Sequence, residues 1–144
     1  MTRADAKALT RVAIDTGALL ALASSRDQYH RRAVATEARF RRSGGRWVGS
    51  TLVLAELHGH LIRRIDPPRA RHVVTALLVD PLFEWHDATA DLVRTAADRW
   101  LTGYADQRFS LTDAVTFELM HRERLDAAFA FDRDFEIAGF TLLD

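Results

Sequence analysis

Four acidic residues of this sequence stand in apolar surroundings, where a carboxylate is unusual. Each lies on or beside an expected strand or helix, and the four are Asp15, Glu56, Asp113 and Asp132. An ionised carboxylate removed from water is stable only when it pairs with a cation, takes up a proton or binds a metal ion. Each acid has an arginine within a turn or two, such as Arg133 beside Asp132, but Lys7 is the only lysine. A divalent metal is therefore the better candidate.

The kind of metal follows from the donor atoms. The chain has no cysteine, and hard carboxylate oxygens favour Mg²⁺ or Mn²⁺ over zinc. Such an ion typically keeps several waters and takes substrate phosphate as a further ligand. The four acids therefore predict metal-dependent chemistry at a phosphodiester.

Strands and helices are expected to alternate along the chain, separated by breaks such as Gly44-Gly45 and Asp66-Pro67-Pro68. The expected strands are 12–15, 46–49, 82–85, 127–131 and 140–143. The expected helices are 17–24, 27–42, 51–64, 68–78, 88–101, 111–122 and 133–138. This alternation indicates an α/β fold in which helices cover both faces of a parallel sheet.

The order of elements predicts where the acids lie. In open α/β sheets, ligands bind at the carboxyl ends of the strands, where the topology switches direction. Asp15 and Asp132 fall at such ends, Glu56 is in the second turn of helix 51–64, and Asp113 is in the first turn of helix 111–122. One rim of the sheet could therefore gather all four. Their separations along the chain are too long for local structure to bring them together.

We expect one domain over residues 12–144, preceded by a flexible arm over residues 1–11. A chain of 144 residues has the length of a single domain and buries about two-thirds of its unfolded surface. The sequence has no internal repeat, low-complexity tract or glycine-rich linker. The loop over residues 103–109 is the segment most expected to be mobile.

The composition is that of an ordinary globular protein, with 48% hydrophobic and 28% charged residues. The absence of cysteine suits a reducing compartment, so we expect the cytoplasm. No apolar stretch reaches the roughly 18 residues of a membrane span, and residues 1–10 lack the apolar core of a signal peptide.

The net charge of zero conceals an asymmetry between the two halves. Residues 1–79 hold 14 basic and 6 acidic residues, a difference of +8, whereas residues 80–144 hold 6 and 14, a difference of −8. The basic surplus is concentrated between Arg26 and Arg46. This segment is compatible with phosphate or nucleic-acid binding, and equally with a solvated helix face in a chain that uses arginine in place of lysine.

Four segments in series resemble the PIN-domain ribonucleases, and most closely the VapC toxins of bacterial toxin-antitoxin pairs. The resemblance runs from about Val12 to Leu143, and the segments are Ile14-Asp15-Thr16-Gly-Ala-Leu-Leu-Ala-Leu22, Ser50-Thr-Leu-Val-Leu-Ala-Glu56-Leu, Ser110-Leu-Thr-Asp113-Ala, and Phe131-Asp132-Arg-Asp-Phe135 followed by Gly139-Phe140. Each segment alone is weak, but their order and spacing together are specific.

The resemblance implies a three-layer α/β/α sandwich with a central parallel sheet. It implies a hydrolase, an endoribonuclease in which the four acids bind one or two Mg²⁺ or Mn²⁺ ions and a metal-activated water attacks an RNA phosphodiester. The products would carry 5′-phosphate and 3′-hydroxyl ends. It also implies tRNA or rRNA as substrate, a cognate antitoxin that blocks the acidic pocket with a basic side chain, and a homodimer.

Two positions bear on the fourth acid. Many relatives have threonine or serine two residues before it, where a hydroxyl can hold metal-bound water, whereas this chain has Ala130. Asp134, two residues after Asp132, could substitute or assist, although we favour a structural role for it.

Local sequence also allows structural roles for the acids. Asp15 and Asp132 stand where an acid caps a helix, Asp113 follows Ser110 at the spacing of a capping box, and a glutamate such as Glu56 on a helix flank is common. Only the four together favour function. His58 and His60 are expected to make surface or partner contacts, and the tryptophans to pack in the core; these are Trp47, Trp85 and Trp100.

The sequence argues against two other kinds of site and leaves two other functions open. A receiver domain needs a lysine near its last strand, but the only lysine here is Lys7. The sequence also has no phosphate-binding P-loop. The main alternative is a catalytically weak PIN-like module that binds RNA or a protein. A DNA nuclease or a housekeeping enzyme of ribosomal RNA processing is a further one.

Overall fold

The computed structural model describes residues 10–143, and they form a five-stranded sheet in which every pairing is parallel. The strand order is β3-β2-β1-β4-β5. The strands are β1 (Arg11–Ile14), β2 (Arg46–Ser50), β3 (Phe83–His86), β4 (Ala127–Phe129) and β5 (Thr141–Leu143). Each lies within two residues of its predicted bounds. β1 begins inside the arm expected over residues 1–11, whose first nine residues lie outside the described part of the chain.

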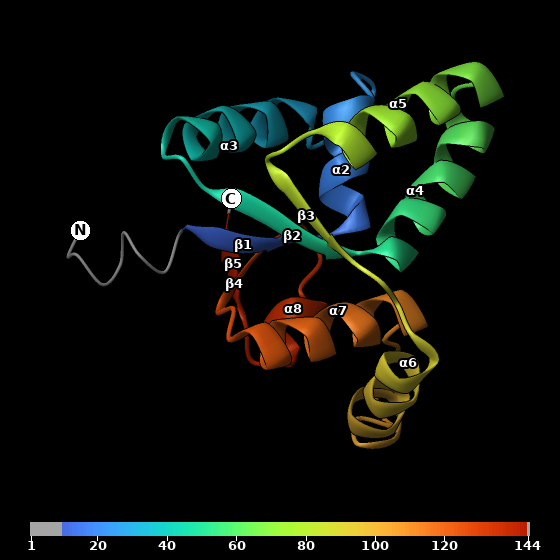
Figure 1. Cartoon of the computed structure of the whole chain (residues 1–144), viewed down its shortest axis with the longest axis vertical. Coiled ribbons are helices and arrows are strands. Elements are labelled where there is room, and N and C mark those ends of the chain that lie inside the picture. The colour runs from blue at the N-terminus through green and yellow to red at the C-terminus, as the bar shows by residue number, and fades with distance from the viewer. Residues whose placement is uncertain (1–9, 144) are drawn as a thin grey trace.

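Helices cover both faces of the sheet, as the alternating pattern predicts (Figure 1). One face carries α2 (Thr16–Ala23), α3 (His30–Arg42), α4 (Thr51–Arg64) and α5 (Pro67–Val79). The other carries α6 (Ala90–Ala96), the π-helix η1 (Ala97–Thr102), α7 (Leu111–Glu123) and α8 (Asp134–Ile137). The three-layer α/β/α sandwich is confirmed. In the described part of the chain, no helix is both long and apolar enough to cross a membrane.

Two elements differ from their predicted extents for local reasons. Helix α3 begins at His30 instead of residue 27, because the Asp27 carboxylate accepts the Tyr29 N–H at 2.9 Å and holds residues 27–29 in a turn. The helix expected over 88–101 divides into α6 and the wider turn of η1. Side-chain periodicity does not distinguish these two helix types.

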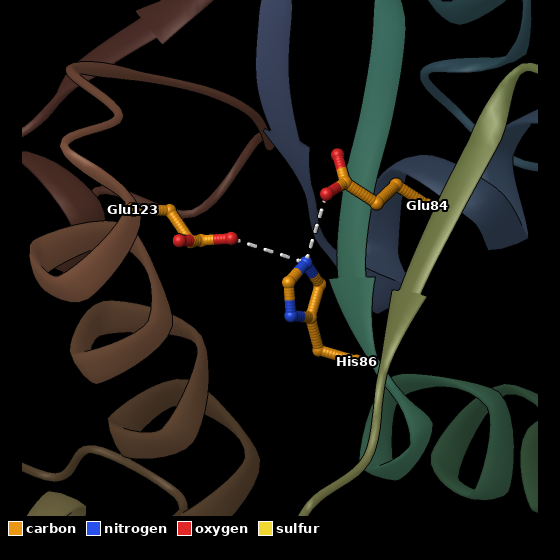
Figure 2. A group of neighbouring side chains, drawn as sticks. All are labelled: Glu84, His86 and Glu123. Atoms are coloured by element: carbon orange, nitrogen blue, oxygen red, sulfur yellow. Dashed lines mark hydrogen bonds and ion pairs between the residues drawn. The ribbon is translucent and has the colours of Figure 1, made fainter.

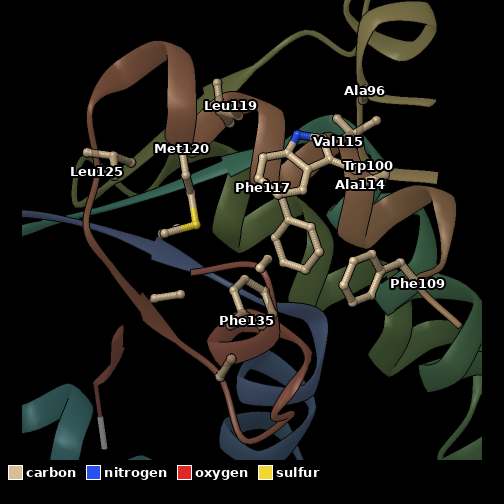
Figure 3. Close-up of a cluster of buried hydrophobic side chains, with 14 of the residues drawn as sticks. Ala96, Trp100, Phe109, Ala114, Val115, Phe117, Leu119, Met120, Leu125 and Phe135 are labelled. Carbon is tan, nitrogen blue, oxygen red and sulfur yellow. The ribbon is translucent and has the colours of Figure 1, made fainter. Parts of the chain in front are cut away.

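Each helical layer has its own buried cluster, which fixes the orientation of the helices. Trp47 packs in the cluster beside α2 to α5, stacked on Phe40 with ring centroids 3.9 Å apart. In the other cluster, Phe117 of α7 meets Trp100, Phe109 and Phe135 edge to face (Figure 3). This packing holds α7 against the sheet and thereby sets the place of Asp113 at its first turn.

The α7 cluster also buries one charge, the carboxylate of Glu118, which is 1% exposed. It accepts hydrogen bonds from Arg99 Nε at 2.8 Å, Trp100 Nε1 at 3.1 Å and Arg122 Nε at 3.2 Å. The bonds from Arg99 and Trp100 link α7 to η1 and satisfy the indole of Trp100, whereas Arg122 lies one turn along α7 from Glu118.

We expect Glu118→Ala to lower the free energy of unfolding by about 1–3 kcal/mol, because it leaves the Trp100 N–H without an acceptor while both arginines can still reach water. Urea denaturation checks this. Glu136→Ala is the control, because Glu136 is half exposed and its pair with Arg133 spans 3.7 Å; its effect should stay within about 0.5 kcal/mol. Equal losses in both variants would contradict the role of the buried carboxylate.

Candidate metal centre

A pocket of about 460 Å³ opens at the carboxyl ends of the strands, and all four predicted acids line it. The chain builds β1, β2 and β3 outward in one direction and then β4 and β5 in the other, so the strand order reverses between β1 and β4. Asp15 directly follows β1 and Asp132 lies three residues beyond β4. The site therefore occupies the topological switch point, where α/β sheets bind ligands.

Asp15 is the most buried of the four acids, at 7% exposure. It occupies the N-cap position of α2, but its side chain makes no capping hydrogen bond, so helix capping does not explain it. Burial, helped by the charges of Asp113, Glu56 and Asp132 and opposed by the Thr16 N–H, raises the pKa of Asp15 to about 7. Within residues 10–143 it forms no ion pair with any basic side chain.

Asp113 has both a structural partner and a place in the pocket. Ser110 Oγ accepts the Asp113 N–H at 3.0 Å, and Asp113 Oδ2 accepts the Ser110 N–H at 3.1 Å, which confirms the capping box. Burial nevertheless raises the pKa of Asp113, helped by the charges of Asp132 and Asp134. The capping box orients this carboxylate toward the site and leaves Oδ1 outside the capping bond.

Asp132 is exposed, and the backbone positions it: Asp132 Oδ1 accepts the Asp134 N–H at 2.9 Å. One carboxylate oxygen from each of Asp113, Asp132 and Asp134 lies within 4.8 Å of the others. Asp134 does not line the pocket, yet burial and the Asp132 charge raise its pKa. The structural role that the sequence favours for Asp134 does not require it to lie this close to Asp113 and Asp132. Ala130, at the position where many relatives have threonine or serine, is buried at 1% exposure and offers no hydroxyl to the site.

Glu56 reaches the pocket from α4, whose apolar face is fully buried through Val53, Leu57 and Leu61. His60 and Arg64 line the same pocket. The three polar residues are spaced by four along α4, which places them in one stripe beside the apolar face. That spacing is visible in the sequence, so it could have predicted His60 and Arg64 as pocket residues in addition to the four acids.

One wall of the pocket is aromatic and comes from the residue that precedes α3 and from the segment after β4. The rings of Tyr29 and Phe131 stack with centroids 4.4 Å apart, and both line the pocket. The Arg32 guanidinium lies 5.4 Å from the Phe131 centroid and 5.6 Å from that of Tyr29. Two segments about 100 residues apart meet here, so no local pattern could reveal this wall.

The residues of the pocket fit a hard divalent metal. Four carboxylates supply oxygen donors, and the ionised form of Asp15 is costly without a cation. Thr16 Oγ1 is buried next to Asp15 and has no hydrogen-bond partner among the described residues. An unsatisfied hydroxyl in a polar pocket is suited to a metal-bound water.

A second group of ligand-type side chains lies elsewhere and already has an arginine as its partner. Glu84 and His86 of β3 meet Glu123 at the end of α7, with His86 Nε2 3.2 Å from Glu84 and 3.4 Å from Glu123 (Figure 2). Arg11 bonds to both carboxylates, at 2.9 Å and 3.2 Å. Burial would raise the pKa of Glu84, but the bonds from Arg11 and His86 lower it. Glu123 is ten residues from Asp113, about 15 Å along α7, so this group is separate from the pocket.

Comparisons with known proteins give related results from sequence and from structure. The PIN domain family profile matches residues 12–140. The 23S rRNA-specific endonuclease VapC20 of Mycobacterium tuberculosis (strain ATCC 25618 / H37Rv) is 34% identical over 92 residues, which are 64% of this chain and 69% of that protein. The crystal structure of Mycobacterium tuberculosis VapC20, described as a sarcin-ricin loop cleaving toxin, superposes with a TM-score of 0.82 at 28% identity over 90% of this chain and 96% of that chain.

A more distant match concerns the fold alone. The structure of VapBC2 from Rickettsia felis, bound to a DNA fragment from its promoter, gives a TM-score of 0.64 at 13% identity over 92% of this chain and 96% of that chain.

Proposed function

Since the chain belongs to the PIN-domain family and is a VapC-like endoribonuclease, we propose that its four pocket acids bind Mg²⁺ or Mn²⁺ for RNA hydrolysis. The acids are Asp15, Glu56, Asp113 and Asp132. The observation that carries this assignment is their arrival from four distant segments in one pocket at the switch point of the sheet. The burial of Asp15 without a basic partner supports a cation there.

Each part of the site has a distinct task. A bound metal would supply an activated water and charge stabilisation at the phosphoryl group. Asp15 provides a carboxylate that must first release its proton, because its pKa is about 7. The Ser110 N–H orients Asp113 and the Asp134 N–H orients Asp132, so neither carboxylate has to reorganise when it becomes a ligand. Accepting a backbone N–H and binding a metal are therefore compatible roles for these two acids, although Arg133, and not Asp132, is the N-cap of α8.

The proposed substrate is ribosomal RNA, because the relatives that match this chain are described as 23S rRNA-specific and as cleaving the sarcin-ricin loop. Purified protein is incubated with intact ribosomes, with extracted rRNA and with tRNA, each in Mg²⁺, in Mn²⁺ and in EDTA. We expect one discrete rRNA cut, abolished by EDTA, with 5′-phosphate and 3′-hydroxyl ends. A discrete cut in tRNA alone would make tRNA the substrate in place of rRNA. If folded protein free of antitoxin cuts no RNA, the catalytically weak module that binds RNA or a protein would be favoured.

We also propose that the protein acts in the cytoplasm as a homodimer, as one domain over residues 12–144, and under control of a cognate antitoxin. A basic antitoxin side chain would be held among the carboxylates of the pocket. Light scattering of the purified protein tests the dimer. Restoration of growth when a neighbouring small reading frame is co-expressed tests the antitoxin.

Asp132 and Asp134 allow a matched test of which acid is a ligand. We expect Asp132→Asn to lower kcat by about 100-fold, because Asp132 lines the pocket. Asp134→Asn should cost less than about 10-fold, because its backbone N–H, which orients Asp132, is retained. Initial cleavage rates at saturating Mg²⁺ measure both. A larger loss for Asp134→Asn would make Asp134 the fourth ligand.

A further inference from the structure

A second pocket lies beside the acidic one and has the opposite charge. It measures about 400 Å³ and is formed by the end of α2, the turn that follows it, the end of α4 and the start of α5. We call it the arginine pocket, and its lining residues with polar side chains are Ser24, Ser25, Arg26, Arg64, Asp66 and Arg69. Arg64 also lines the acidic pocket, so the two share a wall.

The arginines of this pocket are only weakly neutralised. Arg69 Nε is 3.4 Å from Asp66, whose other oxygen accepts the Arg69 N–H, and the Arg69 side chain is 76% exposed. Arg64 is 3.8 Å from Asp27. Arg26 forms no hydrogen bond or ion pair within residues 10–143. Exposed pairs at such distances contribute little, so three guanidiniums face two carboxylates and remain available to an anion.

The donor chemistry of the pocket suits a phosphate diester. A guanidinium presents a planar fork that matches two phosphate oxygens, and Ser24 and Ser25 place hydroxyls at the same pocket. α5 starts with Pro67 and Pro68, which carry no N–H. An anion here would therefore be held by side chains and not by the helix terminus.

The acidic pocket makes such a site necessary for a polyanionic substrate. Four carboxylates with one divalent ion still leave a negative site, and without the metal their repulsion of RNA is stronger. Affinity for RNA must then come from nearby cations, because phosphate contacts dominate nucleic-acid binding. Arg26 and Arg69 are suitably placed for this, one wall away from the acids.

We propose that the arginine pocket binds a backbone phosphate of the RNA substrate, adjacent along the strand to the phosphodiester that is cleaved among the acids. The inference rests on the proposed function for the nature of the ligand. It assigns Arg26 and Arg69 as binding residues, with Arg64 at the border between the two pockets.

The test measures RNA binding separately from cleavage. Fluorescence anisotropy in EDTA uses a labelled single-stranded RNA of about 12 nucleotides, because phosphate contacts do not depend on sequence. The variants are Arg26→Gln and Arg69→Gln. Arg71→Gln is the matched control, since Arg71 is exposed on the same helix as Arg69 and does not line the pocket.

We expect each pocket variant to weaken binding several-fold and to reduce the slope of log Kd against log salt by about 0.7, the value for one phosphate contact on a single strand. Arg71→Gln should leave the slope unchanged. In cleavage assays the pocket variants should raise KM and retain kcat. Thermal unfolding confirms that all three variants fold.

Several results would overturn the proposal. One is that Arg26→Gln and Arg69→Gln bind RNA like Arg71→Gln, and another is that the wild-type chain binds no RNA. Weaker antitoxin binding with unchanged RNA binding would assign the pocket to a protein partner instead. Failure of the proposed function looks different, because a wild-type chain that never cleaves RNA can still show the loss of binding in the pocket variants.

Discussion

Asp15→Asn is expected to reduce RNA cleavage by on the order of 10³-fold. Loss of a residue that only orients a ligand typically costs 10–100-fold, and loss of one preorganised group that stabilises the transition state costs about 10²–10³-fold. Asp15 is the most buried acid and lies nearest the end of the central strand β1. An asparagine of the same shape keeps the packing but removes the negative charge that a metal requires.

The measurement is the initial rate of cleavage in Mg²⁺ and in Mn²⁺, with the circular dichroism spectrum and thermal unfolding of the same samples. Asp106→Asn is the control, because Asp106 is an exposed loop aspartate that does not line the pocket. Full activity in Asp15→Asn would exclude the four-acid mechanism. Loss of the fold in Asp15→Asn would instead make Asp15 a structural residue.

The sequence predicted the elements well because each carries a local signal. The apolar run before Asp15 forms β1, and Pro67 and Pro68 begin α5 after the Asp66 cap, which accepts the Arg69 N–H at 2.8 Å. The tryptophan prediction is also confirmed for Trp47 and Trp100, which are buried. Hydrophobic periodicity and capping residues act over one or two turns, so such features are visible in a single sequence.

The composition of the pocket needed tertiary information. Asp15, Glu56, Asp113 and Asp132 were expected at one rim because parallel strands align their carboxyl ends, and the structure places them there. The stack of Tyr29 on Phe131 depends on how α3 packs against the segment after β4, which no spacing encodes. The closeness of Asp134 to Asp113 likewise depends on the placement of α7 by its buried phenylalanines.

The second large expected effect is on how the free energy of unfolding changes with pH, and its direction follows from the pKa of Asp15. The folded-state pKa is about 7 and the ordinary value is 3.8, so the folded protein binds this proton more tightly than the unfolded chain. The contribution of this proton to the free energy of unfolding is fully present below about pH 4 and is lost as the pH rises through 7. A shift of about 3 units corresponds to about 4 kcal/mol, an order-of-magnitude figure. The raised pKa of Asp113 acts in the same direction.

We therefore expect metal-free wild-type protein to lose stability between about pH 5 and pH 8, while Asp15→Asn loses less and is the more stable of the two at about pH 8. Urea denaturation of both proteins in EDTA across this range measures the difference. Parallel pH profiles would show that Asp15 is already ionised and paired in the folded protein.

Adding metal should reduce the stability advantage of Asp15→Asn at about pH 8, because a divalent cation competes with the proton for the same carboxylates. Mn²⁺ at about 100 times its Kd would stabilise the wild-type protein by about 2.7 kcal/mol, and this gain should grow as the pH rises and the acids ionise. Asp15→Asn should gain little at any pH. The comparison requires no substrate, so it tests the acids as ligands even where cleavage cannot be measured. A metal-induced gain of equal size in both proteins would place the ion away from Asp15, among Asp113, Asp132 and Asp134.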